Sequence, residues 1–150
     1  MKIIAHRGNL NGPNPDKENH PDYIKETLKL GYDIEVDVWF NDQKWYLGHD
    51  QPMYEIKYSF LLNRKFWLHA KNGDAFNELL QDCTLNVFWH TTEDWILTSK
   101  GYIWTYPNKF LYDDSICVLP EQGWLGNIKR CQGICTDFVY KFEKFKLGLP

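Results

Sequence analysis

The chain lacks the features that mark several large classes of protein. No hydrophobic run reaches the roughly 18–20 residues that a membrane-spanning helix needs. The 17 Lys and Arg residues are scattered among 20 acidic residues, which argues against the basic stripe of a nucleic-acid-binding protein. The residues before His6 are too few for the apolar core of an export signal. We therefore expect a cytoplasmic protein with no nucleic-acid partner and no stable membrane insertion; its oligomeric state is left open.

Cysteine is also scarce, with four residues in the chain. Cys131 and Cys135 are separated by three residues, so they do not have the Cys-x2-Cys spacing of common zinc sites. Without an export signal, the cysteines are expected to be reduced thiols. They are interpreted as small hydrophobic residues of the core rather than as metal ligands.

What the sequence does contain is a set of short apolar runs. The expected strands are 2–5, 33–40, 45–47, 66–71, 86–90, 102–105, 115–119 and 133–136. Between them, helices are expected after Pro21, after a cap at Asp74 and over 138–145, and helical spacing also relates Trp124, Leu125, Ile128 and Cys131. Strands that alternate with such connections indicate an α/β protein with a parallel sheet.

The length limits how this sheet can close. A full (β/α)8 barrel usually takes about 250 residues, and this chain has 150. We therefore predict one domain, residues 1–150, that forms a small or incomplete TIM-type (β/α) barrel with shortened helices. An open barrel of roughly seven strands would also fit this length.

The strongest local signal is a pair of carboxylates, Glu35 and Asp37. Residues two apart on a strand point to the same side, so these carboxylates meet in one place while Ile34, Val36 and Val38 face the other way. Two buried carboxylates repel each other unless a cation joins them, and a divalent metal with oxygen ligands would do so. The alternative is a solvated face of an antiparallel edge strand.

Basic side chains follow two of the expected strands. His6 and Arg7 come directly after the first strand, and His49 comes after 45–47, where parallel α/β proteins place their chemistry. Two histidines can serve as general base and general acid near neutral pH, and arginine offers a planar fork for phosphate. A single histidine is usually structural, so the prediction depends on the whole set.

Five further residues remain ambiguous at this stage. Lys71 could neutralise a phosphate oxygen, and His69, on the same strand face, could be a metal ligand or a hydrogen-bonded core residue. His90 ends a strand and has the same ambiguity, whereas Glu121 could reach the same rim or start an exposed helix. Asp137 follows the last expected strand and could cap the final helix.

Several of these segments together resemble the glycerophosphodiester phosphodiesterase family, of the PI-PLC-like phosphodiesterase superfamily, in a short form. The opening match consists of His6-Arg7-Gly8, Glu18-Asn19, the segment Gly31 to Val38 and Gly48-His49-Asp50. Weaker similarities are Leu68 to Lys71, which resembles the family's third strand, and Gln132 to Phe138, which resembles its last. The stretch from Asn86 to Lys129 is only loosely covered.

The resemblance implies a TIM-type barrel and a divalent cation. It implies that His6 and His49 are the acid–base pair, and that Arg7 and Lys71 bind the substrate phosphate. Glu35 and Asp37 are then the metal ligands. Mg²⁺ or Ca²⁺ is the first expectation for such carboxylate ligands. The family has Glu where this sequence has His69, and because His69 could be a third ligand, Mn²⁺ and Zn²⁺ are alternatives.

The implied function is metal-dependent hydrolysis of a small-molecule phosphodiester, with a glycerophosphodiester-like substrate, in lipid metabolism. Two alternatives stay open. A catalytically weak or inactive barrel would bind a phosphorylated ligand without turnover. A lysophospholipid phosphodiesterase of the phospholipase D-like or sphingomyelinase D-like type would cleave a lipid instead of a water-soluble diester.

Overall fold

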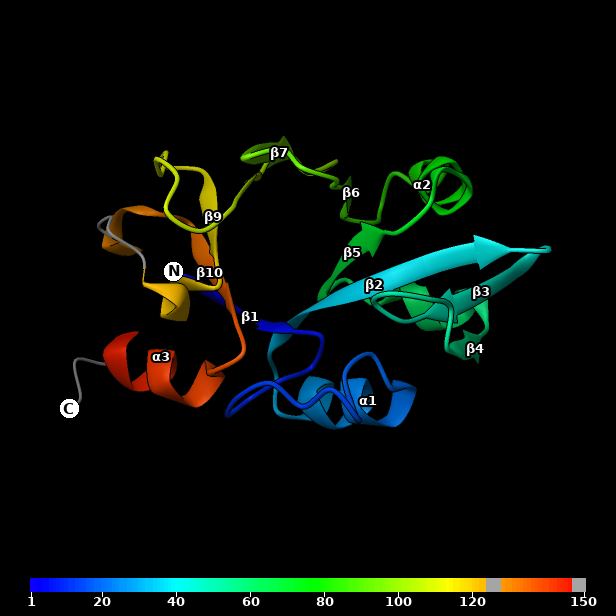
Figure 1. Cartoon of the computed structure of the whole chain (residues 1–150), viewed down its shortest axis with the longest axis horizontal. Coiled ribbons are helices and arrows are strands. Elements are labelled where there is room, and N and C mark those ends of the chain that lie inside the picture. The colour runs from blue at the N-terminus through cyan, green and yellow to red at the C-terminus, as the bar shows by residue number, and fades with distance from the viewer. Residues whose placement is uncertain (124–127, 147–150) are drawn as a thin grey trace.

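A computed structural model describes residues 1–123 and 128–146 of the chain (Figure 1). Its strands are β1 (Lys2–His6), β2 (Asp33–Asn41), β3 (Lys44–Leu47), β4 (Tyr54–Ile56), β5 (Phe66–Ala70), β6 (Val87–Trp89), β7 (Trp95–Leu97), β8 (Ile103–Thr105), β9 (Ser115–Val118) and β10 (Gly133–Thr136). The helices are α1 (Pro21–Lys29), α2 (Gly73–Leu80) and α3 (Val139–Lys146), with 3-10 helices η1 (Tyr58–Leu62), η2 (Pro120–Gln122) and η3 (Ile128–Arg130).

All ten strands belong to one mixed sheet that curls into a half-barrel (Figure 1). The strands run β4-β3-β2-β1-β10-β9-β8-β7, and β2 also pairs with β5, which pairs with β6. The ladders from β8 through β9, β10, β1, β2 and β5 to β6 are parallel. The pairs β2–β3, β3–β4 and β7–β8 are antiparallel.

The predicted TIM-type (β/α) barrel with shortened helices is therefore wrong. A barrel of that type needs a helix after each parallel strand, and the described residues do not show that alternation. Between β2 and β5 the chain forms the β3–β4 hairpin and η1, and between β6 and β8 it forms the antiparallel strand β7. Short hairpins and 3-10 turns take the place of crossover helices.

The two faces of the sheet have different partners. Ile34, Val36 and Val38 of β2 lie in a buried apolar cluster with residues of α1 and α2, as their alternation in the sequence predicts. On the concave face, a second buried cluster contains Ile4, Trp67, Phe88, Trp104, Ile116, Val118 and Cys135. This second cluster forms an apolar layer inside the curl of the sheet.

The predicted strands from 2–5 to 133–136 are all present, and β4 and β7 are strands in addition to them. The N-cap of α2 is Asn72, whose side chain accepts a hydrogen bond from the Ala75 backbone, so the predicted cap at Asp74 is wrong. The helix expected around Trp124 to Cys131 falls partly outside the described residues, and its described part includes η3.

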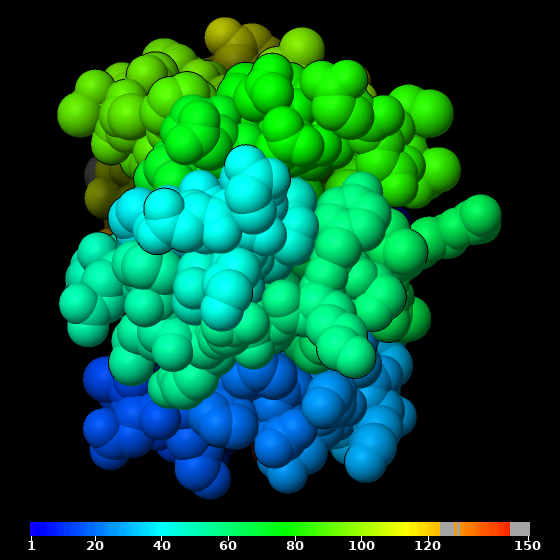
Figure 2. All heavy atoms as spheres, turned by 90° about the vertical axis from the view of Figure 1, so that its right-hand side faces the viewer, coloured from blue at the N-terminus to red at the C-terminus, as the bar shows by residue number. Residues whose placement is uncertain are grey.

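A space-filling view from the side of β3 and β4 shows three stacked bands of chain (Figure 2). The α1 region forms the bottom band, the β3–β4 hairpin and η1 the middle band, and the α2 region the top band. Among the described residues, no helix combines the length and the apolar character that crossing a membrane would require.

Candidate functional site

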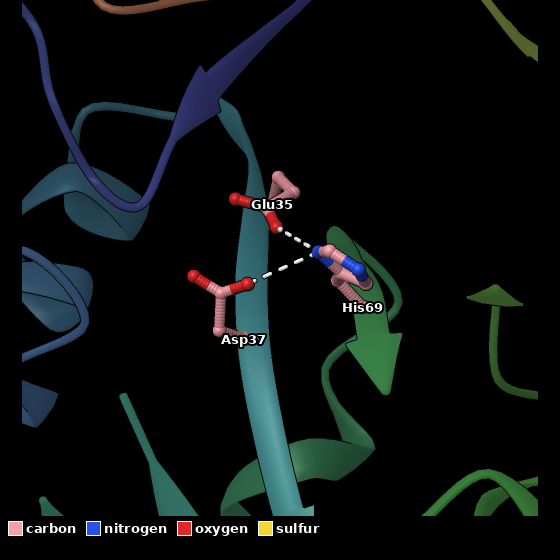
Figure 3. Close-up of side chains that lie close together, drawn as sticks. All are labelled: Glu35, Asp37 and His69. Carbon is pink, nitrogen blue, oxygen red and sulfur yellow. Dashed lines mark ion pairs between the residues drawn. The ribbon is translucent and has the colours of Figure 1, made fainter. Parts of the chain in front are cut away.

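The centre of the site is formed by Glu35 and Asp37 on β2 and His69 on β5 (Figure 3). The parallel register pairs Asp37 directly with His69, and the period of two along β2 points both carboxylates toward the imidazole. The Nδ1 atom of His69 lies 3.0 Å from Asp37 Oδ1 and 3.4 Å from Glu35 Oε1. All three residues are buried.

Two longer basic side chains complete the charge balance around Asp37. Arg7 Nε lies 3.1 Å from Asp37 Oδ2, and Lys71 Nζ lies 3.4 Å from Asp37 Oδ1. Burial alone would raise the pKa of Asp37, but the hydrogen bond and charge of His69, with the charges of Lys71 and Arg7, hold it well below its usual range. For His69, burial alone would lower the pKa, but the hydrogen bonds and charges of Asp37 and Glu35 outweigh burial, so the pKa of His69 is raised.

This group fits a divalent cation. Each of Glu35, Asp37 and His69 offers one ligand atom, and these atoms lie within 4.8 Å of one another. Asp37 Oδ1 is buried and lacks a hydrogen-bond partner of good geometry, although His69 Nδ1 and Lys71 Nζ lie within 3.4 Å of it, so the protein does not fully satisfy this atom. Two carboxylates and one imidazole suit Mn²⁺ or Zn²⁺ better than they suit Mg²⁺ or Ca²⁺, which prefer sites made only of oxygen ligands.

His6 lies at the carboxyl end of β1, beside Glu35 in the sheet register. Its Nδ1 atom is 2.8 Å from Asp137 Oδ1, and its Nε2 atom is 4.0 Å from Glu35 Oε2. Burial would lower the pKa of His6, but the hydrogen bond of Asp137 and the charge of Glu35 outweigh it and raise the pKa. Asp137 also accepts a hydrogen bond from the buried Asn9 side chain.

The predicted role of Asp137 as a helix cap is therefore wrong. Its carboxylate binds His6 and Asn9, and the backbone N–H of Tyr140, one of the two that a cap at Asp137 could bind, donates instead to the Leu10 carbonyl. Glu121 in turn accepts from the Asp137 backbone N–H and the Thr136 hydroxyl. Glu121 thus supports the loop that carries Asp137.

His49 lies on the loop that follows β3, with 40% of its side chain exposed. The loop is fixed to β2, because Gly48 N–H donates to the Asp37 carbonyl and the Trp39 indole donates to the Gly48 carbonyl at 2.6 Å. Gly48 has a φ of +149°, and a Cβ there would lie 2.1 Å from the Gln51 carbonyl oxygen. Only glycine fits this close approach, which sets where His49 projects.

Asn19 and Glu18 have positioning roles that sequence reasoning did not assign. The Asn19 amide donates to Asp37 Oδ2 at 2.8 Å and its oxygen accepts from the Asp37 backbone N–H at 3.0 Å, which fixes that carboxylate. Glu18 accepts from Arg7 Nη1 and from the Asn9 amide. Their position in the quoted Glu18-Asn19 motif was the only sequence signal for these roles.

Every predicted site residue except Asp37 lines one cavity of about 340 Å³. Its lining comprises His6, Arg7, Glu35, His49, His69, Lys71, His90, Thr91, Trp104, Tyr106, Val118 and Leu119. Asp37 lies beneath it, fully buried. His90 stacks on Tyr106 with ring centroids 3.7 Å apart, and burial together with the charge of His69 lowers its pKa. His90 therefore belongs to the cavity wall, while His69 belongs to the carboxylate group.

No family model, curated protein or solved structure matches this chain.

Proposed function

We propose that this cavity carries out metal-assisted cleavage of a small phosphodiester. The observation that carries the proposal is the coincidence of three kinds of group in one cavity. A compact carboxylate–imidazole group lies beside two histidines, His6 and His49, and two cationic side chains, Arg7 and Lys71. Buried ionisable groups concentrated in a cavity are typical of catalytic sites, because folding alone gains little from them.

In this proposal Glu35, Asp37 and His69 hold a divalent cation. When bound, such a cation supplies electrostatic stabilisation of the negative charge that develops on the phosphoryl oxygens. Arg7 and Lys71 line the same cavity and offer N–H donors to the remaining oxygens. Asn19 holds the Asp37 carboxylate in place from behind.

Both histidines have Nδ1 bound by a carboxylate, Asp137 for His6 and Asp50 for His49, but His6 is largely buried and His49 is half-exposed, which suggests different duties. Asp137 occupies Nδ1 of His6, so Nε2 is the atom left to exchange a proton with the reactants. We assign His6 as the base that takes a proton from the nucleophile, which is a substrate hydroxyl or water. His49, half-exposed on its loop, is the acid that protonates the departing alkoxide. Attack by a neighbouring hydroxyl would release a cyclic phosphate.

A second candidate function is binding of a phosphorylated ligand without turnover. It is favoured by the ion pairs of His69 and Lys71 with Asp37, since these cations can neutralise the carboxylate without a metal. In that case Arg7 and Lys71 would bind the phosphate and the histidines would only add hydrogen bonds. Metal titration and turnover separate the two candidates.

The test is a panel of small phosphodiesters incubated with the purified protein and Mn²⁺, Zn²⁺ or Mg²⁺. The panel includes a glycerophosphodiester and a lysophospholipid, which distinguishes a water-soluble from a lipid substrate. We expect cleavage that EDTA abolishes and that His6→Ala and His49→Ala each reduce at least about 100-fold. His20→Asn is the matched control, because His20 caps α1 outside this cavity and Asn can also cap. Undiminished cleavage in both His6→Ala and His49→Ala would refute the proposal.

A further inference from the structure

Two of the site residues line a second cavity as well. Arg7 and His49 belong to the lining of the 340 Å³ cavity described above, here called the inner cavity. They also line a cavity of about 290 Å³, here called the outer cavity, with Pro15, Glu18, Asn19, Asp50, Gln51 and Met53. A group bound between Arg7 and His49 therefore has access to both cavities.

The two linings differ in chemistry. Beyond its ionic groups, the inner cavity is closed by Trp104 and Val118, which are nearly inaccessible to solvent, and by Tyr106 and Leu119. Such walls favour an apolar or aromatic group. Nothing in this part of the wall offers a charge to a ligand.

The outer cavity is open and exposes hydrogen-bond acceptors. Asp50 and Gln51 are exposed in its lining, and one oxygen of the Asp50 carboxylate contacts His49 Nδ1, whereas the Glu18 carboxylate already accepts from Arg7 and Asn9. Met53, with 53% of its surface exposed, and Pro15 are the apolar parts of this wall. Carboxylates accept hydrogen bonds and cannot donate them when ionised, so a ligand here gains most from hydroxyl or ammonium donors.

We infer that the substrate of the proposed reaction is an unsymmetrical phosphodiester whose phosphate binds between Arg7 and His49. A small alcohol with hydroxyl or ammonium groups occupies the outer cavity, and an apolar or aromatic ester group lies in the inner cavity. The assignment rests on the proposed function for the diester linkage, but the preference of the outer cavity for a polar phosphate ester can be measured without turnover.

Methionine provides a selective probe, because the chain has only two methionines and they lie in different places. Met53 lines the outer cavity, and Met1 lines a separate cavity with Lys2 and Tyr32. Protein labelled with ¹³C at the methionine methyl groups is titrated, with stoichiometric Zn²⁺, with glycerol 3-phosphate, phosphoethanolamine, phenyl phosphate and inorganic phosphate. The Met1 signal is the internal control.

We expect glycerol 3-phosphate or phosphoethanolamine to shift the Met53 methyl signal, and the tighter of the two identifies hydroxyl or ammonium as the preferred donor. Phenyl phosphate and inorganic phosphate should leave Met53 unmoved. The inference is overturned if neither polar ester shifts Met53, or if phenyl phosphate shifts it equally.

Gln51→Leu adds a second measurement, because it removes one polar group from the outer cavity while keeping a side chain of similar size. It should weaken the tighter polar ester about three- to tenfold and leave phenyl phosphate affinity unchanged. An equal loss for both ligands would overturn the inference. If the Met53 signal shifts in a protein that cleaves no diester, the proposed reaction is refuted and this cavity assignment stands. If the protein cleaves a diester and no polar ester shifts Met53, the cavity assignment is refuted and the reaction stands.

Discussion

The two ends of β1 and β2 carry cavities of opposite character. At the amino ends lies a cavity of about 460 Å³, lined by Met1, Lys2, Ile3, Leu30, Gly31, Tyr32, Asp33 and Glu143. The smaller cavity of the site, about 340 Å³, lies at the carboxyl ends, where β1 finishes at His6. Volume alone would select the amino ends, but the residues that line the larger cavity include no comparable group of buried charges.

The difference between the two ends is clearest in two ion pairs whose carboxylates, Asp33 and Asp37, both lie on β2. Lys2 Nζ lies 4.0 Å from Asp33 Oδ2, with 44% and 23% of the two side chains exposed. Lys71 Nζ lies 3.4 Å from Asp37 Oδ1, with 16% and 0% exposed. Water screens the first pair, whereas the second is held where charges interact strongly and desolvation is costly. Burial of charge, rather than cavity size, is therefore our reason for proposing the carboxyl ends as the functional end.

Removal of a buried carboxylate is the strongest test of this comparison. Asp37→Asn should lower both Zn²⁺ affinity and diester cleavage by at least about 100-fold, or ~2.7 kcal/mol, because it removes a ligand and leaves nearby cations unpaired. Calorimetric titration and turnover assays measure the two effects. Asp33→Asn makes the same chemical change on the same strand face and should alter neither by more than about twofold. Equal losses in the two variants would erase the distinction between the ends.

The second test concerns which metal the site selects. His69→Glu creates an all-carboxylate group, so we expect Mg²⁺ affinity to rise and Zn²⁺ affinity to fall, each by about tenfold. Calorimetric titration of both metals gives the ratio of their affinities. His90→Gln is the control, because His90 lines the same cavity outside the carboxylate group and should leave the ratio unchanged. An unchanged ratio in His69→Glu would exclude His69 as a ligand.

Local pattern was sufficient to predict much of this site. Alternation along 33–40 predicted the shared direction of Glu35 and Asp37, and the ends of the strands predicted that His6 and Arg7 would lie beside them. The same reasoning placed His69 and Lys71 on one strand face. These predictions succeeded because a strand fixes side-chain direction by parity alone.

The failures concern contacts between residues far apart in the chain. Nothing in the local sequence relates Asp137 to His6 across 131 positions, and Asn19 reaches Asp37 only because a loop folds back over β2. The barrel prediction failed for a related reason. Short connections can be crossover helices or antiparallel hairpins, and the choice made at β3–β4 and β7 depends on packing that the pattern of apolar runs does not reveal.

Two glycines extend the comparison of the two ends to backbone constraint. Gly48→Ala should destabilise the protein by about 2–4 kcal/mol, because φ is +149° and the new Cβ would meet the Gln51 carbonyl. Gly31, at the opposite end, has a φ of +93° but open space around its Cβ position, so Gly31→Ala should cost only about 1 kcal/mol. Urea unfolding measures both. Similar losses would mean that contact with the His49 loop adds no constraint.

The smallest expected effect is the pH dependence of stability in EDTA. His6 and His69 have pKa values raised above 6.5, so the stability they contribute is fully present below pH 6.5 and is lost as the pH rises through their raised values. Asp37 has a pKa lowered from 3.8, so its contribution is present above that pH and is lost on further acidification. Thermal unfolding should therefore show greatest stability between about pH 4 and 6.5. His69→Gln should reduce the fall in melting temperature above about pH 6.5, and the control His20→Asn should leave that fall unchanged. A melting temperature that rises from pH 6 to 8 would contradict this prediction, because it would mean that the buried imidazoles are neutral beside their carboxylates.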